Sequence, residues 1–171
     1  MSVRSSIEQA TKTVMGALSP SQGETDILDT LQAEHDEVQD LLQRLTKSET
    51  AREQKSLVNQ IKQALVPHTK AEEEVVYTPI AALSAEKAKI DGAEGFTEHA
   101  LASATLMQLD SLTPNTPEFK AAAKVLKELV DHHVQEEERN IWSQVKENFS
   151  GEQREQMNRD FLAAKKRVRV P

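Results

Sequence analysis

The chain has 171 residues, a formal net charge of −7 and a sequence pI of about 5.3. This negative charge disfavours binding to nucleic-acid phosphates, and the absence of Cys excludes disulfides, thiolate catalysis and Cys-ligated zinc or iron–sulfur centres. No apolar run approaches the roughly 18 to 20 residues of a membrane span, and residues 1–22 lack the apolar core of a secretory signal. We therefore expect a cytoplasmic protein that binds neither nucleic acid nor membranes.

The amino-acid composition favours helices. Hydrophobic residues make up 37% of the chain and charged residues 29%, proportions typical of a globular domain with its own core. Only 4% of the residues are aromatic and only 5 are glycine, whereas Ala, Leu, Glu, Lys and Gln recur. The recurring residues are good helix formers, so we expect an all-α fold.

The first predicted element is a short amphipathic helix over residues 3–18, followed by a Ser-Pro-Ser-Gln-Gly linker at 19–23. Thr25 is the expected N-cap of the first long helix, which ends before a polar turn at 47–50. The buried seam of this helix follows 3-4 spacing and comprises Leu28, Leu31, His35, Val38, Leu42 and Leu45.

The second helix is expected to kink at Pro67, which removes one backbone hydrogen bond. Its seam comprises Val58, Ile61, Leu65, His68, Glu72, Val75 and Pro79. The mostly polar stretch 87–95 is predicted to be a loop, and a third helix is predicted over 95–112. The stripe of the third helix comprises Phe96, His99, Ser103, Leu106 and Leu109.

The Thr-Pro-Asn-Thr-Pro stretch at 113–117 is the clearest break, and a fourth helix is predicted to start near Pro117. Its seam comprises Ala122, Leu126, Leu129, His133, Glu137 and Ile141. A further amphipathic helix is predicted over 152–166, with a tail of solvated basic residues. The tail residues are Lys165, Lys166, Arg167 and Arg169.

Four main helices with short connections predict an up-down-up-down four-helix bundle. We divide the chain into an N-terminal segment and linker (1–22), the bundle (23–148) and a C-terminal helix with its basic tail (149–171). No strand-like alternation and no internal repeat compete with this interpretation.

Four of the 5 histidines interrupt the apolar seams, one on each main helix. They are His35, His68, His99 and His133. A buried imidazole needs a partner at each ring nitrogen, or it loses about 1 to 3 kcal/mol. One such histidine is more often a hydrogen-bonded core residue than a ligand, but four on four helices point into the same interior and indicate a metal site.

Two of these histidines are followed four residues later by a carboxylate, as His68–Glu72 and His133–Glu137. Residues i and i+4 share a helix face, so each pair can reach one centre. Imidazole nitrogens with carboxylate oxygens suit iron, manganese or zinc, and two carboxylates are able to bridge two ions. The Glu-x-x-His pairs of ferritin-like bundles do not occur on these seams.

The register of the fourth helix has an alternative, because His132 and Glu136 form a second pair rotated by about 100° around the helix. The apolar stripe favours His133 and Glu137. The neighbouring carboxylates are expected to be solvated charge, with some accepting an imidazole N–H. These residues are Glu73, Glu74, Glu136 and Glu138.

On these residues the chain resembles the hemerythrin-like, or HHE cation-binding, domains, over residues 26–148. The resemblance is carried by LQAEH at 31–35, HTKAEE at 68–73, EHA at 98–100 and HHVQEEE at 132–138. Tyr77 and Trp142 each follow the paired histidine by nine residues, where the family usually places an aromatic side chain that packs near the site.

The resemblance implies a non-haem di-iron centre with an oxo or hydroxo bridge, with manganese and zinc as alternative metals. It implies that the terminal ligands are His35, His68, His99 and His133, and that the bridging ligands are Glu72 and Glu137. Ser103 stands where the oxygen carriers of the family have a further histidine, so oxygen transport does not carry over directly.

Three functions follow from this reading, and the sequence leaves open whether the chain is an enzyme. The first is a protein that binds or senses a small ligand such as O2, NO or peroxide. The second is a di-iron enzyme that decomposes peroxide or reactive nitrogen species. The third is a structural or iron-responsive bundle stabilised by its metal. The first is preferred.

Overall fold

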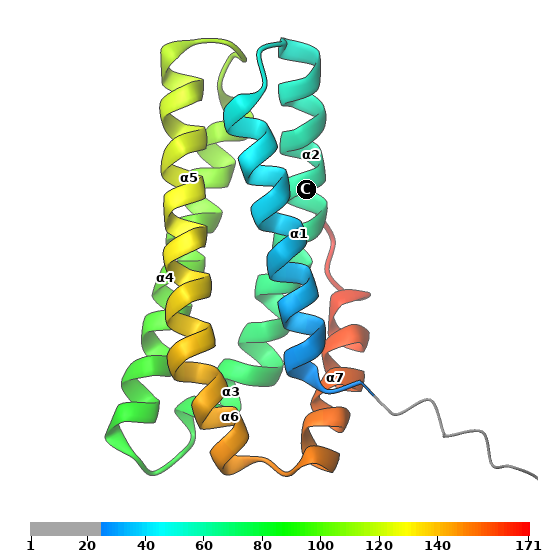
Figure 1. Ribbon diagram of the computed structural model, residues 1–171, viewed down its shortest axis with the longest axis vertical. Coiled ribbons are helices and arrows are strands. Elements are labelled where there is room, and N and C mark those ends of the chain that lie inside the picture. The colour runs from blue at the N-terminus through cyan, green and yellow to red at the C-terminus, as the bar shows by residue number, and fades with distance from the viewer. Residues whose placement is uncertain (1–24) are drawn as a thin grey trace, which may run out of the picture.

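The structure is a computed structural model that describes residues 25–171, and every regular element within this range is helical. Four long helical segments run up, down, up and down in chain order, and a fifth helix lies against one side (Figure 1). The all-α bundle with an additional C-terminal helix is thereby confirmed. The helix predicted over 3–18 and the linker at 19–23 lie outside the described residues.

The first two helices form an antiparallel pair. Helix α1 (Ile27–Lys47) is capped by Asp26, whose side chain accepts from the Leu28 N–H, so the expected cap at Thr25 is wrong by one residue. Helix α2 (Ala51–Glu72) is capped by Thr50. It continues through Pro67 into the π-helical turn η1 (Glu73–Tyr77) and the short helix α3 (Thr78–Ala81).

Helix α4 (Glu86–Ser111) begins about two and a half turns earlier than predicted, and the loop expected at 87–95 is wrong. Two glycines of this stretch are buried where neighbouring elements approach the helix. A Cβ atom at Gly95 would lie 2.3 Å from Tyr77 Cε1, and one at Gly92 would lie 3.2 Å from Ala81 Cβ. Small residues are therefore needed for close packing against η1 and α3, whereas the backbone remains helical.

The fourth segment follows the break at 113–117. Helix α5 (Pro117–Glu136) has Pro at its first position and Thr116 as its cap. It continues through a second π-helical turn, η2 (Glu137–Ile141), into α6 (Trp142–Asn148). Both π-helical turns directly follow or include a Glu of the His-x-x-x-Glu pairs, and such turns frequently occur at functional sites.

Two apolar clusters fill the bundle, one towards each end. Leu42, Ile61 and Leu126 are fully buried in the first cluster. Leu31 and Ile80 are fully buried in the second. The four seam histidines lie between the two clusters along every long helix, so a polar layer separates two hydrophobic cores.

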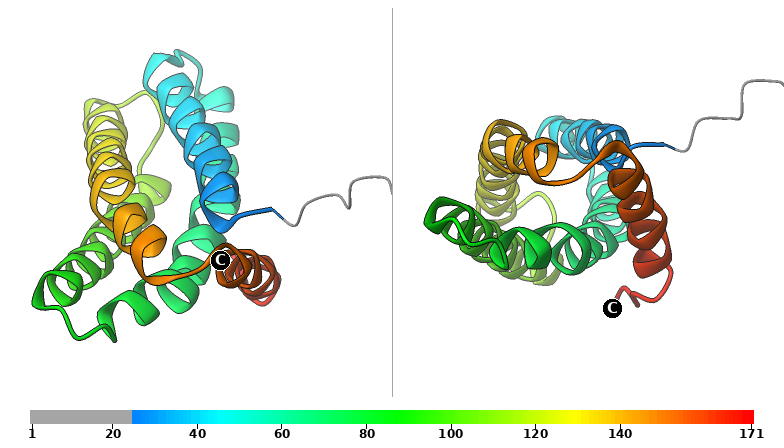
Figure 2. Two further views of the ribbon diagram at one scale, coloured as in Figure 1. Left: turned by 60° about the horizontal axis from the view of Figure 1, so that its bottom comes forward. Right: turned by 90° about the horizontal axis from the view of Figure 1, so that it is seen from below.

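Helix α7 (Gly151–Lys165) packs beside α1 and α2 (Figure 2). Phe161 of this helix is fully buried, with a relative accessible surface of 0%. Arg154 Nε donates to Asp26 Oδ2 at 2.7 Å, which ties the start of α7 to the start of α1. No helix in residues 25–171 is long and apolar enough to cross a membrane.

Ser150 begins α7 with a capping box, in which its hydroxyl accepts from the Gln153 N–H and the Gln153 side chain accepts from the Ser150 N–H. We expect Ser150→Ala to lower the free energy of unfolding by about 1 kcal/mol, the usual cost of losing such a cap. Urea unfolding of the purified protein measures this change. Ser143→Ala is the control, because its exposed mid-helix hydroxyl bonds only the Arg139 carbonyl. Equal unfolding midpoints for the two variants would contradict the expectation.

Candidate metal centre

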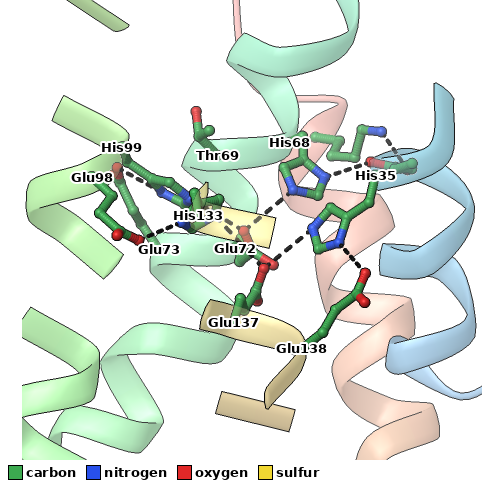
Figure 3. Close-up of polar contacts among 12 residues, drawn as sticks. His35, His68, Thr69, Glu72, Glu73, Glu98, His99, His133, Glu137 and Glu138 are labelled. Atoms are coloured by element: carbon green, nitrogen blue, oxygen red, sulfur yellow. Dashed lines mark hydrogen bonds and ion pairs between the residues drawn. The ribbon is translucent and has the colours of Figure 1, made fainter. Parts of the chain in front are cut away.

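The polar layer between the two apolar clusters contains one histidine from each long helix. His35 comes from α1, His68 from α2, His99 from α4 and His133 from α5, and none exposes more than 7% of its surface. Their side chains converge on two carboxylates (Figure 3). All six residues that the sequence singled out are therefore brought together.

The inner ring nitrogens face the two buried carboxylates. Glu72 Oε2 lies 3.3 Å from Nε2 of both His68 and His99. Glu137 Oε2 lies 3.2 Å from His35 Nε2 and 3.7 Å from His133 Nε2. Each carboxylate thus connects two histidines from different helices, which is the arrangement that a bridging ligand requires.

The outer nitrogens of two histidines are held by carboxylates that the sequence analysis did not single out as partners. His68 Nδ1 lies 3.0 Å from Glu34 Oε2, and His133 Nδ1 lies 2.8 Å from Glu98 Oε2. An ionised carboxylate accepts, so Nδ1 of each imidazole donates to it, and Nε2 is the ring atom that faces the interior and would ligate a metal ion.

The other two histidines have longer contacts of the same kind. His35 Nδ1 lies 3.4 Å from Glu138 Oε1, and His99 Nδ1 lies 3.4 Å from Glu73 Oε1. Each outer carboxylate comes from the helix next to that of its histidine, so the contacts close a ring around the bundle. In order around the ring the pairs are Glu34–His68, Glu73–His99, Glu98–His133 and Glu138–His35.

Several inner atoms lack a hydrogen-bond partner within the described residues. Both carboxylate oxygens of Glu72 and of Glu137 are buried without one, as is His35 Nε2. Burying such groups unsatisfied costs about 1 to 3 kcal/mol each, and more for a charged group. A cation at this position would satisfy them, so the donor set fits a metal ion.

Two overlapping groups of donor atoms have the spacing of metal sites. One group consists of His35, His68 and Glu72, and the other of Glu72, His99 and His133. Within each group the ligand atoms lie within 4.8 Å of one another. Glu72 belongs to both groups, so one carboxylate is common to the two candidate sites.

The charges of the cluster depend on burial and on neighbouring groups. Burial raises the pKa of Glu137, and the negative charge of Glu72 raises it further. Burial also acts to raise the pKa of Glu72, but the interactions with the nearby His68 and His99 imidazoles outweigh burial and hold that pKa well below its usual range. Burial lowers the pKa of His68, yet Glu72 and Glu34 raise it to about 10. A metal ion entering the cluster must therefore displace imidazole protons.

The structure places the alternative pair of the fourth helix outside this layer. The side chain of His132 is 63% exposed, and its Nε2 lies 3.4 Å from Glu98 Oε1. Glu136 accepts from Arg139 and Asn140 instead of facing the histidines. His133 and Glu137 are the residues of this segment that face the interior.

Two aromatic side chains pack against the histidines, as their spacing predicted. The ring of Tyr77 contacts His99 edge-on with the centroids 5.2 Å apart, and Trp142 stacks on His35 at 6.1 Å. The Tyr77 hydroxyl is buried without a hydrogen-bond partner among the described residues. Burial and the nearby charge of Glu137 raise the pKa of Tyr77 well above its usual range, so the phenol stays protonated.

A cavity of about 10 Å³ adjoins the four histidines on the side of the first apolar cluster. This is about the space that one water molecule needs. Its other lining residues are Val38, Leu65, Thr69, Ala102, Val130 and Val134. Ser103, which replaces the further histidine of the oxygen carriers, is only partly buried and does not line this cavity. Ala102 occupies that wall instead.

The fold and this cluster define a class of protein, the helical bundles that hold metal cations between histidines and carboxylates. Residues 26–145 match the family model "Hemerythrin HHE cation binding domain", and the chain belongs to this family. No solved structure gives a significant match.

A relative from Nostoc sp. (strain PCC 7120 / SAG 25.82 / UTEX 2576) carries the name "DNA nickase". It is 31% identical over 142 residues, which cover 83% of this chain. The chain spans only 40% of the length of that relative.

Proposed function

We propose that the chain is a non-haem di-iron protein that binds or senses a small ligand such as O2, NO or peroxide at a carboxylate-bridged centre. His35 and His68 would hold one ion, His99 and His133 would hold the other, and two carboxylates would be shared between them. The shared carboxylates are Glu72 and Glu137. The observation that carries the proposal is that these carboxylates each contact histidines of two helices and that all four of their oxygens lack a hydrogen-bond partner in the described part of the chain.

When bound, an iron pair supplies reversible electron transfer and a coordination position for a small ligand. The protein's own part is to orient four imidazoles through their outer nitrogens and to keep bulk water away from the centre. Six protein ligands leave more open positions than the seven of the oxygen carriers, because Ala102 and Ser103 offer no donor to the cavity. Manganese and zinc are the alternative metals for this donor set.

The small apolar cavity supports a small ligand over a large substrate. It lies against the four histidines and holds about 10 Å³, enough for a molecule of about the size of water. A DNA phosphodiester does not fit this space, and the net charge of −7 opposes approach to DNA. We therefore expect this chain not to nick DNA, and a plasmid-nicking assay with the iron-loaded protein tests that expectation.

Filling the cavity is expected to slow ligand binding. We expect Ala102→Leu to reduce the association rate of azide or NO by about tenfold or more, because the larger side chain occupies the space beside His99 and His133. Stopped-flow absorbance of the iron-loaded protein measures this rate. Ala104→Leu is the matched control on the exposed face of α4. Equal rates for both variants, at equal iron content, would contradict the proposed ligand position.

The same iron-loaded preparation distinguishes the proposed binding function from the enzymatic and structural alternatives. Sustained consumption of peroxide above that of free iron would replace the binding function with an enzymatic one. A large loss of thermal stability on chelation, with no ligand binding, would favour a structural role.

A further inference from the structure

We infer that helix α7, which lies beyond the residues that match the family model, helps to orient a ligand of the metal centre. Lys165 acts through Glu34 as a positioning residue for His68. This contact would give a metal ion at His35 and His68 a different rate of release from an ion at His99 and His133. The inference rests on the proposed metal-binding function and specifies how one of its two positions is tuned.

The contact is a chain of three side chains from three helices. Lys165 Nζ donates to Glu34 Oε1 at 2.5 Å, and His68 Nδ1 donates to Glu34 Oε2 at 3.0 Å. Each oxygen of the Glu34 carboxylate therefore accepts from a different side chain. Lys165 fixes the direction in which Glu34 accepts from the imidazole, and the imidazole orientation in turn fixes the direction of His68 Nε2.

Burial separates this ion pair from the solvated pairs of the surface. The side chains of Lys165 and Glu34 are 24% and 18% exposed. By contrast, both side chains of the Arg167–Glu74 pair are 60% exposed. Water and salt screen the exposed pair, whereas a charge-assisted hydrogen bond in the partly buried position is stronger. The sequence-based expectation that Lys165 is solvated charge is therefore wrong.

Helix α7 also holds His68 through an apolar contact. The ring of Phe161, one turn before Lys165, is fully buried and meets His68 edge-on with centroids 5.8 Å apart. Lys165 Nζ lies 5.5 Å above the same Phe161 ring. His68 is thus held on two sides by a helix that follows the matched domain in sequence.

The other half of the ring of carboxylates has no such support from α7. Glu98, the partner of His133, contacts His132, whose side chain is 63% exposed. Glu73, beside His99, pairs with Lys70, whose side chain is 56% exposed. The structure therefore predicts that removal of the Lys165 charge affects the metal position at His68 selectively.

The test measures release of Co2+ from the full-length protein into excess chelator, followed by the visible absorption of the bound ion. We expect two phases, one for each position. The variants Glu34→Gln and Glu98→Gln assign the two phases, because the first removes the carboxylate charge beside His68 and the second removes the one beside His133. Mutation of a residue that directly contacts a ligating histidine typically changes metal affinity about 10- to 100-fold. Lys165 is one contact further from the metal, so we expect Lys165→Met to accelerate the Glu34-sensitive phase by about 3- to 10-fold and to leave the other phase unchanged.

Two further variants separate positioning from a structural role. Arg167→Met, which removes a neighbouring but exposed charge, is expected to change neither phase. Lys165→Met combined with Glu34→Gln is expected to release Co2+ no faster than Glu34→Gln alone, because both act through one contact. Co2+ release is compared at a temperature well below the melting point of each metal-free variant, because loss of the partly buried Lys165–Glu34 bond itself lowers stability.

A Lys165→Met protein that matches Arg167→Met in both phases would overturn the inference, as would equal acceleration of both phases or a single phase in the wild-type protein. A wild-type protein that takes up no Co2+, iron or other divalent metal would overturn the proposed function itself. The two failures are thus distinguishable.

Discussion

Replacing Glu72 with alanine is expected to abolish binding of both metal ions. Glu72 is the residue common to both donor groups, and its Oε2 lies 3.3 Å from Nε2 of His68 and of His99. Its removal leaves neither position with a carboxylate from α2. We expect the metal content to fall from about two ions per chain to nearly none.

Metal analysis of the purified variant measures this loss, and thermal melting provides a second readout. With free metal at about 100 times its dissociation constant, binding stabilises the wild-type fold by about 2.7 kcal/mol, and Glu72→Ala is expected to lose this stabilisation. Glu74→Ala is the matched control, because Glu74 is two residues further along and its side chain is 60% exposed. A Glu72→Ala protein that still holds both ions would exclude Glu72 as a bridging ligand.

Gly95→Ala is expected to destabilise the bundle by about 1 to 3 kcal/mol, although alanine is the better helix former. The added Cβ would lie 2.3 Å from Cε1 and 2.5 Å from Cζ of Tyr77, a ring that is fully buried and packs against His99. The ring cannot move without disturbing the second apolar cluster and the histidine beside it.

Urea unfolding gives the change in free energy, and the near-ultraviolet circular dichroism of the single tyrosine and tryptophan reports on the packing. Gly151→Ala is the control, because a Cβ there meets nothing within 4 Å. We expect that control to be neutral or slightly stabilising. A stable Gly95→Ala protein would mean that the Tyr77 ring is more loosely held than its burial indicates.

The bundle and the inner residues of the site could be predicted because they depend on local periodicity. A helical seam repeats every three or four residues, so histidines at 35, 68, 99 and 133 in apolar seams had to face the interior. The same argument placed Glu72 and Glu137 beside them. Pairing on one helix face is a property of a single segment and needs no knowledge of its neighbours.

The errors arose where contacts between segments decide the structure. The mostly polar stretch 87–95 indicated a loop, but Gly92 and Gly95 within it allow close packing against Ala81 and Tyr77, which no local pattern reveals. The π-helical turns after Glu72 and at Glu137 were likewise not predicted. Each shifts the helical register beyond the site.

The outer carboxylates were the main omission from the predicted site. Glu34 and Glu98 each precede a seam histidine in sequence, but they serve the histidine of the next helix. Glu73 and Glu138 were expected chiefly as solvated charge, yet both contact an outer imidazole nitrogen. An acidic residue directly before His35 and His99 was the available signal, and only the arrangement of the helices shows which imidazole it reaches.

The most direct test of the proposed centre is to purify the protein from iron-supplemented cells and to measure metal per chain together with the near-ultraviolet and visible spectrum. The proposal predicts about two irons per chain and ferric charge-transfer bands that shift when azide is added. Zinc alone, or no metal after careful preparation, would contradict the di-iron assignment.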